Sequence, residues 1–381
     1  MQSKDSASES NLTEEEEEEL DPQQELYYKD TIAKLEKKLR NSYRESNLAQ
    51  ALRDRCFRLA RESIAPPNWL ITKTKSSPNA PGTPTLFLSD WHWSEIVRPE
   101  EVNFKNAFNL EIAKARAKYC IEASIEVLFK HAKTPEYPGL VLALGGDMIS
   151  GSIHDELKES NEIEVMPTVI DIVEVLVWAI NELSKYFEYI FLPCVTGNHG
   201  RYTRKIRMKQ RAFQSYDWLI YTFLDKIFVK NKQVQFFIPE GPDALYQVHN
   251  VKYLLTHGDS LGRGGDGLIG PIGPITRGDH RRRTRNTGLG LSYDVLICGH
   301  FHQLMMLRSR IINGSLKGLD EYAYTQAFGY EPPMQALWLT HPKRGITYST
   351  PVFCSDSETN KILESSKTSW ISYYNNRNIT N

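Results

Sequence analysis

Five short motifs rich in Asp, His and Asn follow one another along the chain, and their side chains are of the kinds that bind divalent metal ions. They are Asp90-Trp91-His92, Gly146-Asp147, Gly197-Asn198-His199, His257-Gly258-Asp259 and Gly299-His300-Phe301-His302. Mixed carboxylate, amide and imidazole ligation suits manganese, iron or zinc better than calcium. Two such ions held together can hydrolyse a phosphate ester, so the constellation predicts a two-metal phosphoesterase.

Each motif directly follows an apolar run of the kind that forms a buried strand. These runs are residues 85–89, 139–144, 189–195, 253–256 and 293–298. The carboxyl ends of strands in α/β sheets converge on a ligand crevice, so side chains placed there meet in space. A single Asp-x-His or Asn-His motif is more often a turn or cap than a ligand site. The shared position of all five after strands favours a metal centre.

The wider pattern indicates an α/β chain, with strands alternating with long helices and a more β-rich second half. Helices are expected at residues 103–132, 164–186 and 205–230. Further strands are expected at residues 234–238, 245–249, 252–256, 294–298, 304–312, 335–340 and 346–353. This order predicts two packed sheets flanked by helices.

Composition divides the chain into five segments. The acidic start has nothing to bury and is expected to be disordered. An amphipathic helix follows, which either docks on its own domain or mediates homo-oligomer formation. After a Ser/Pro/Gly-rich linker come the main domain and a flexible polar tail. The boundaries are 1–22 for the acidic segment, 23–65 for the helix, 66–84 for the linker, 85–353 for the domain and 354–381 for the tail.

The overall composition is that of a globular protein, with 381 residues, 40% hydrophobic and 24% charged residues and a net charge of -1. The five cysteines are odd in number and far apart, which argues against a disulfide framework. No run of about 18 apolar residues could cross a bilayer, and the N-terminus has no apolar signal region. We therefore expect a cytoplasmic protein with no membrane partner.

The ordered motifs resemble those of the calcineurin-like metallophosphoesterase superfamily over residues 85–353. The resemblance implies a four-layer sandwich of two mixed β-sheets flanked by helices, here preceded by the N-terminal helix. It implies two divalent metal ions, and the mixed His, Asp and Asn ligand set favours manganese, with iron, zinc or magnesium as alternatives. The implied ligands are Asp90, His92 and His302 for one ion and Asn198, His257 and His300 for the other, with Asp147 bridging the two.

The same resemblance assigns a catalytic role to His199, which would protonate the leaving oxygen while a metal-bridging water attacks the phosphorus. Asp147 would position the metal pair. In the family the residue after this histidine is usually Asp or Glu, whereas here it is Gly200. Support for His199 must then come from elsewhere, with Asp259, His154 and Asp155 as candidates.

Basic residues suggest a polyanionic substrate. Two clusters, at residues 201–211 and 277–285, flank the predicted centre, where cations would neutralise phosphates. The second cluster lies in the Gly-rich segment 258–290, which we expect to be a loop covering the cleft. Tyr202, Tyr216 and Trp218 are candidates for base stacking, although aromatic residues in a helical pattern more often belong to the core. The candidate substrate contacts are His154, Arg201, Arg204, Arg281, Arg282 and Arg283.

These features predict a phosphodiesterase that cuts DNA or RNA. Within the superfamily, the Gly-Asp-Met-Ile-Ser-Gly sequence at 146–151 and the Arg-rich segment resemble the DNA-repair-exonuclease branch, in particular phage-type members, which would act in a host cytoplasm. One alternative is a hydrolase of small phosphoesters, nucleotides or phosphoproteins. Another is a non-catalytic metal-binding assembly module, which Gly200 keeps open and the complete ligand set disfavours.

Overall fold

The computed structural model describes residues 67–71, 82–131, 135–153, 155–262 and 272–355. The predictions for the acidic segment 1–22, the helix 23–65 and nearly all of the tail 354–381 lie outside the described residues. His154 also lies outside them. Four of the five cysteines are described, and all four are buried and free, as expected.

The first sheet has six strands in the order β11-β10-β1-β2-β3-β4. Strands β1 to β4 run parallel, and β10 and β11 add antiparallel partners beyond β1. The central strands are buried on both faces, which explains their continuous apolar sequences. The bounds are β1 Thr83–Leu88, β2 Leu140–Leu144, β3 Ile190–Pro193, β4 Val234–Phe237, β10 Met334–His341 and β11 Gly345–Phe353.

The second sheet has five strands in the order β5-β6-β7-β9-β8 and is also mixed. The pairs β6–β7 and β7–β9 are parallel, whereas β5–β6 and β8–β9 are antiparallel. The bounds are β5 Asp243–Val248, β6 Val251–Thr256, β7 Val295–Cys298, β8 Met305–Leu307 and β9 Arg310–Ile312. The run expected as one strand at 304–312 is therefore a tight hairpin.

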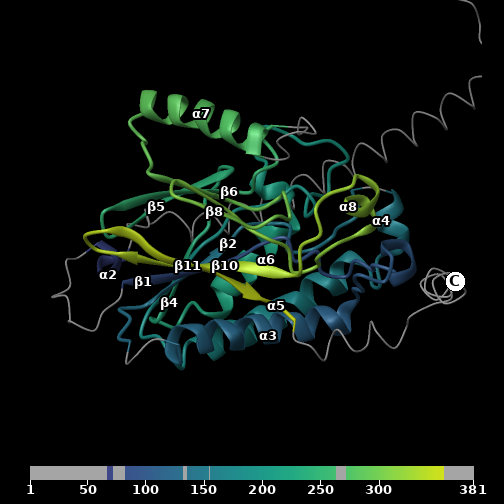
Figure 1. Ribbon diagram of the computed structural model, residues 1–381, viewed down its shortest axis with the longest axis horizontal. Coiled ribbons are helices and arrows are strands. Elements are labelled where there is room, and N and C mark those ends of the chain that lie inside the picture. Colours follow the sequence, from purple (N-terminus) through teal and green to yellow (C-terminus); the bar gives the residue numbers. More distant parts are fainter. Residues whose placement is uncertain (1–66, 72–81, 132–134, 154, 263–271, 356–381) are drawn as a thin grey trace, which may run out of the picture. The chain divides into compact units, whose positions relative to one another are not determined.

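The two sheets face each other across an apolar core that includes Phe87, Phe191, Tyr253 and Trp338. The other face of the first sheet is covered by α3 (Leu110–Phe129), α5 (Val165–Leu183) and α6 (Tyr216–Ile227). Helix α7 (Ile272–Gly288) covers the outer face of the second sheet (Figure 1). The layers are thus helix, sheet, sheet and helix, and the predicted four-layer α/β architecture is confirmed.

Short elements complete the description. They are α2 (Asn68–Ile71), η1 (Pro99–Val102), α4 (Asp155–Ser160), η2 (Ala212–Gln214) and α8 (Glu321–Thr325). Helix α2 lies within the segment expected to be a linker, where Leu70 is buried and Trp69 stacks on Tyr189 at 5.9 Å. No described helix is both long enough and apolar enough to span a bilayer.

Two expectations about the basic segments were wrong. The helix expected over 205–230 begins only at Tyr216, where Ser215 caps its first turn, so the basic residues 201–211 lie in irregular chain. The loop expected over 258–290 contains helix α7 instead. This helix forms because a narrow stripe, including Ile275 and Gly278, packs closely on Leu261 and the second sheet.

Candidate metal centre

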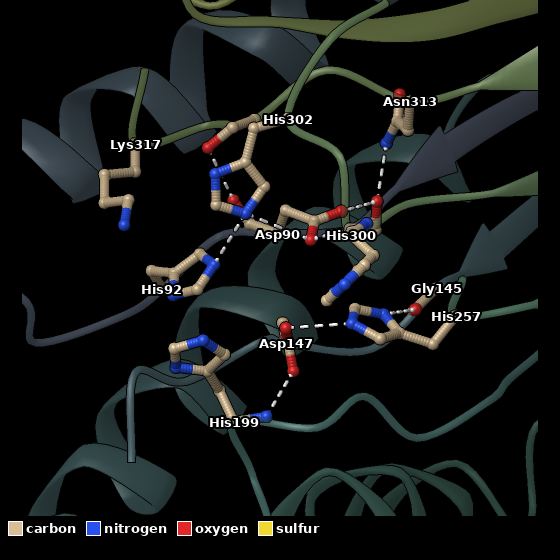
Figure 2. A network of polar contacts seen from close by, with 12 residues as sticks. Asp90, His92, Gly145, Asp147, His199, His257, His300, His302, Asn313 and Lys317 are labelled. Atoms are coloured by element: carbon tan, nitrogen blue, oxygen red, sulfur yellow. Dashed lines mark hydrogen bonds and ion pairs between the residues drawn. The ribbon is translucent and has the colours of Figure 1, made fainter. Parts of the chain in front are cut away.

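Asp90, Asp147, Asn198, His257 and His300 follow β1, β2, β3, β6 and β7 in that order, and the strand ends bring the five motifs together. Figure 2 shows Asp90, Asp147, His257 and His300 close to one another. Three overlapping groups of metal-ligand atoms form there, each with its atoms within 4.8 Å of one another. The groups are Asp90, His92 and His302; His92, Asp147 and His199; and Asp147, His257 and His300. The structure thus places the predicted ligands together, while their roles as ligands stay predictions.

The first group matches the predicted first ion. Nε2 of His92 and Nε2 of His302 lie 3.0 Å apart, and the His302 Nε2 lies 3.4 Å from Oδ1 of Asp90. Asp90 and His92 are fully buried, whereas the side chain of His302 is 23% exposed. Burial lowers the pKa of His92 to about 4, with further lowering by the charges of Lys317 and His199. A neutral imidazole is the form that binds metal.

The second group matches the predicted second ion, with Asp147 between the two. Nε2 of His257 lies 2.9 Å from Oδ2 of Asp147 and 3.1 Å from Oδ1 of Asn198. Burial and the charge of His257 lower the pKa of His300 to about 4. Asn198, His300 and His302 are partly exposed, while Asp147 and His257 are buried, so solvent can reach the centre past the first three side chains.

The surroundings of His257 show that the centre needs a positive charge. Its Nδ1 lies 2.8 Å from the carbonyl oxygen of Gly145, which can only accept a hydrogen bond, so Nδ1 carries the proton. In a neutral ring, the Nε2 lone pair would then face the two oxygen atoms of Asp147 and Asn198, which is repulsive. Burial opposes a charged ring, but the Asp147 carboxylate outweighs it and raises the pKa of His257 to about 10. A proton or a metal cation satisfies this geometry, so the residues fit a bound divalent ion.

The backbone at the centre is unusual. Five of the predicted ligands lie in the left-handed region with φ between 47° and 71°, namely Asp90, His92, Asp147, His300 and His302. Non-glycine residues in this region cost about 1 to 3 kcal/mol each and cluster at functional sites. The turns that follow the strands therefore hold these side chains inward at an energetic cost that the surrounding packing must offset.

Glu95 holds His92 from behind, and the sequence reasoning missed it. Its Oε2 lies 3.2 Å from Nδ1 of His92 and accepts a hydrogen bond from Ser150 Oγ, while its Oε1 bonds Lys317 Nζ at 2.7 Å. Burial opposes ionisation, yet Lys317 holds the pKa of Glu95 well below its usual range. Glu95 could have been found from the sequence, because it lies only three residues after His92. Lys317 is distant in sequence, and no sequence pattern indicated that it lies near His92.

Asp90 is oriented in the same way. Its Oδ2 accepts a hydrogen bond from Ser89 Oγ at 2.5 Å, and its Oδ1 accepts one from the His300 backbone N–H at 2.9 Å. Asn313 donates in turn to Ser89 Oγ. Such outer contacts fix the direction of metal ligands and are worth about 10- to 100-fold in metal affinity or activity.

Asp217 fills the space beside Gly200. Its buried carboxylate accepts backbone N–H groups from Asp147 at 3.1 Å, Met148 at 3.2 Å and Gly197 at 2.8 Å. Burial and the nearby Asp147 raise the pKa of Asp217 to about 6. A Cβ on Gly200 would lie 2.9 Å from the Asp217 Cγ, so a carboxylate from α6 occupies the place that a side chain at position 200 would need.

His199 lies beside His92 and Asp147. Its backbone N–H donates to Asp147 Oδ1 at 2.7 Å, and its Nδ1 lies 3.1 Å from the carbonyl oxygen of Ser150. Of the supports considered from the sequence, Asp259 instead pairs with Arg211 at 2.9 Å. The Ser150 carbonyl, in the loop after Asp147, and the edge-on ring of His92 at 4.6 Å both contact the His199 ring.

The two basic clusters differ in their relation to the centre. Arg201 donates to the carbonyl oxygen of Asn198 at 2.5 Å, and the Arg204 side chain is exposed three residues further on. A hollow beside Asn198 is lined by Arg201, Arg207 and Arg211. Arg201 thus lies next to the predicted ligand Asn198, while the roles of Arg201 and Arg204 as substrate contacts stay predictions.

Arg281, Arg282 and Arg283 of α7 are bound to the protein itself. Arg282 pairs with both carboxylate oxygens of Asp243 at 2.6 and 2.7 Å. Arg283 bonds Asp279 and the Tyr293 carbonyl, and Arg281 bonds the Leu261 carbonyl. Their predicted role in substrate binding stays a prediction, but the contacts that the structure gives them are structural.

The three aromatic residues considered for base stacking differ in their exposure to solvent. Tyr202 is 55% exposed, whereas Tyr216 and Trp218 are only partly exposed. Tyr202 packs edge-on against Tyr216, and Trp218 packs edge-on against Phe213. Only Tyr202 among the three thus presents most of its ring to solvent.

The sequence matches no family model and no curated protein sequence. Its fold is similar to solved structures at low identity. A Vps29 single mutant from Entamoeba histolytica is 12% identical, covering 70% of this chain and 98% of its own, with a TM-score of 0.29. A putative 5'-nucleotidase from Staphylococcus aureus is 11% identical, covering 74% and 58%, with a TM-score of 0.30. The sulfate thiohydrolase SoxB from Thermus thermophilus is 9% identical, covering 77% and 61%, with a TM-score of 0.29.

Proposed function

We propose that this protein is a metal-dependent phosphoesterase of the calcineurin-like type that hydrolyses phosphodiester bonds in nucleic acid. The observation that carries the proposal is the convergence of His92, His302 and Asp90 on one side of Asp147 and of His257, His300 and Asn198 on the other. Bound there, two divalent ions would clamp a phosphate and supply a water nucleophile near neutral pH. Manganese is the favoured ion because the donor set mixes imidazole, carboxylate and amide groups.

The protein's own residues orient the reaction. Asp147 lies close to His92 of the first ligand group and to His257 and His300 of the second. It is itself fixed through the backbone N–H that it donates to Asp217. His199 belongs to the group of neighbouring ligand atoms that also contains His92 and Asp147. Because Nδ1 of His199 is taken up by the Ser150 carbonyl, we assign proton transfer to the leaving oxygen to Nε2.

The basic segment 201–211 supports nucleic acid as the substrate. Arg204, Lys205, Arg207 and Lys209 are all exposed in irregular chain that begins two residues after His199. Cations in this position would contact the phosphates that flank the scissile bond. Assignment to the DNA-repair-exonuclease branch stays part of this proposal, as do a cytoplasmic location and the possible homo-oligomer.

A hydrolysis assay with manganese tests the proposal. The substrates are single-stranded DNA, double-stranded DNA, RNA and bis(4-nitrophenyl) phosphate, compared for the wild type, Asp147→Asn and His199→Gln. We expect manganese-dependent cleavage that each substitution lowers by at least about 100-fold, since both residues act at the reacting phosphate. Turnover that survives both substitutions would refute the assigned chemistry, and cleavage confined to small esters would refute the nucleic-acid substrate.

A further inference from the structure

Four large aromatic side chains project into solvent from one short segment, the residues 322–330. Tyr322 is 67% exposed, Tyr324 45%, Phe328 46% and Tyr330 60%. We call these four side chains the aromatic rim. Exposed apolar clusters of this kind are uncommon on soluble proteins and mark sites of interaction.

The N-terminal end of the rim is tied to the His92 side of the metal centre. Asp320 caps α8 by accepting the Ala323 N–H at 2.7 Å and bonds Lys317 Nζ at 2.5 Å. Lys317 also bonds Glu95, which holds His92. Figure 2 shows Lys317 on the side of the centre where His92 and His302 lie.

The C-terminal end is tied to the loop that carries His302. Both carboxylate oxygens of Glu331 accept the Leu304 N–H, at 3.0 and 2.8 Å, and Leu304 follows His302 by two residues. Within the segment, Phe328 N–H donates to the Ala323 carbonyl at 2.9 Å. The segment is therefore fixed at both ends beside the first ligand group, and little conformational entropy would be lost when a ligand binds it.

The chemistry of the rim favours a flat, uncharged partner. The carboxylates around it are already engaged, Asp320 with Lys317, Glu321 with the Arg98 N–H and Glu331 with the Leu304 N–H. What remains toward solvent is a set of aromatic faces and edges, with Tyr322 and Phe328 edge-to-face at 5.9 Å. Every nucleobase offers a π-face to such rings, but only an unpaired base can present it.

We propose that the aromatic rim stacks unpaired bases of a single-stranded nucleic acid whose phosphate enters the metal centre. The inference rests on the proposed function and narrows its substrate class to single strands or single-stranded ends. The rim and the basic segment 201–211 then contact different parts of the strand. The rim stacks on bases near His302, and the cations near His199 bind the phosphate backbone of the nucleic acid.

The test compares a single-stranded oligonucleotide with an abasic oligonucleotide of the same length, which keeps the phosphates but lacks the bases. Binding is measured by fluorescence anisotropy and cleavage by KM and kcat, for the wild type, Tyr330→Ala and the triple variant Tyr322→Ala, Phe328→Ala, Tyr330→Ala. Stacking is worth about 5- to 150-fold in affinity per base, so we expect the wild type to bind the base-bearing strand at least about 10-fold more tightly.

The triple variant should lose most of that preference, bind the abasic strand as the wild type does and keep its kcat on bis(4-nitrophenyl) phosphate. Tyr330→Ala should lose part of the preference, and Tyr330→Trp should retain it. Tyr348→Ala is the matched control, since Tyr348 is 44% exposed on β11, outside the rim. Equal wild-type binding of the two strands would overturn the proposal.

Two further outcomes also overturn it. One is an equal loss of affinity for both strands in the triple variant. The other is a lower molecular mass of the triple variant in solution with an unchanged base preference, which would make the rim a protein interface. Failure of the proposed function is distinguishable, because no phosphodiester would then be hydrolysed, whereas anisotropy reads base stacking without turnover.

Discussion

The two basic segments look alike in sequence and serve different purposes in the structure. In residues 201–211 most cationic side chains are exposed in irregular chain next to Asn198. In helix α7, Arg282 and Arg285 share Asp243, and Arg283 shares Asp279 with Arg310 of β9. The difference lies in the carboxylates that face the arginines, since a paired guanidinium stabilises the fold and an unpaired one attracts anions.

Each basic segment also has a buried carboxylate nearby, and these two carboxylates differ in the groups that they bind. Asp217 follows the segment 201–211 and accepts backbone N–H groups from the loops that carry Asp147 and Asn198. Asp279, in α7, accepts side-chain hydrogen bonds from Arg283, Arg310 and Tyr293. The first carboxylate holds the backbone of two loops of the candidate metal centre, whereas the second joins α7 to the second sheet.

The largest expected effect is on stability. Arg282→Ala leaves Asp243 and Ser260 without their main partner, so we expect the free energy of unfolding to fall by about 3 kcal/mol. Arg204→Ala, the matched change at an exposed arginine, should alter it by less than about 0.5 kcal/mol. Urea denaturation checks both, and equal effects of the two variants would abolish the contrast between the segments.

The two buried carboxylates should separate activity from stability. Asp217→Asn keeps the size of the side chain but replaces one acceptor oxygen with an NH₂ donor that faces backbone N–H groups. We expect kcat for manganese-supported diester hydrolysis to fall by about 10- to 100-fold. Asp279→Asn, assayed below its unfolding midpoint, should keep kcat within about twofold and lower stability instead. A normal kcat in Asp217→Asn would show that it does not position the centre.

The exposed cations should control the salt dependence of nucleic-acid binding. Each phosphate contact to a single strand contributes about 0.7 to the slope of log affinity against log salt concentration. Replacing Arg204, Lys205, Arg207 and Lys209 by Gln should therefore reduce the slope by up to about 2.8. Fluorescence anisotropy at several salt concentrations measures the slope. An unchanged slope would mean that the nucleic-acid backbone does not contact the segment 201–211.

The smallest effect should come from the outward face of α7. Arg277 and Arg281 are exposed there, and Arg281 also donates to the Leu261 carbonyl. Replacing both by Gln should change affinity for the same oligonucleotide by less than about twofold and leave the salt slope near its wild-type value. If the salt slope fell as strongly as in the 201–211 variant, α7 would be a nucleic-acid binding surface, as predicted from the sequence.

The sequence predicted the parts of the fold whose signals are local. Apolar runs followed by Asp, Asn or His located the strand ends, and the structure confirms the layers built from those strands. Helix α7 was missed because it lacks the apolar face that marks a helix. Its buried residues are Pro274, Ile275, Gly278, Asp279, Arg282 and Asn286. Its stability comes from packing and ion pairs with segments distant in sequence.

The same distinction applies to the candidate site. His92 and Asp147 stand in recognisable motifs, but Lys317 and Asp217 meet the centre only through the fold. Lys317 lies 222 residues from Glu95 in sequence, and Asp217 lies 70 residues from Asp147. Residues that orient ligands act across such separations and carry no spacing signature of their own.

The central claim is that the strand ends hold metal, and metal content tests it most directly. The protein is treated with chelator, dialysed against manganese, passed through a desalting column and analysed for metal per chain. We predict about two ions per wild-type chain and a clear loss in His92→Ala and His257→Ala, with folding verified by circular dichroism. Wild-type protein that retains no metal, or variants that retain the full amount, would contradict the account.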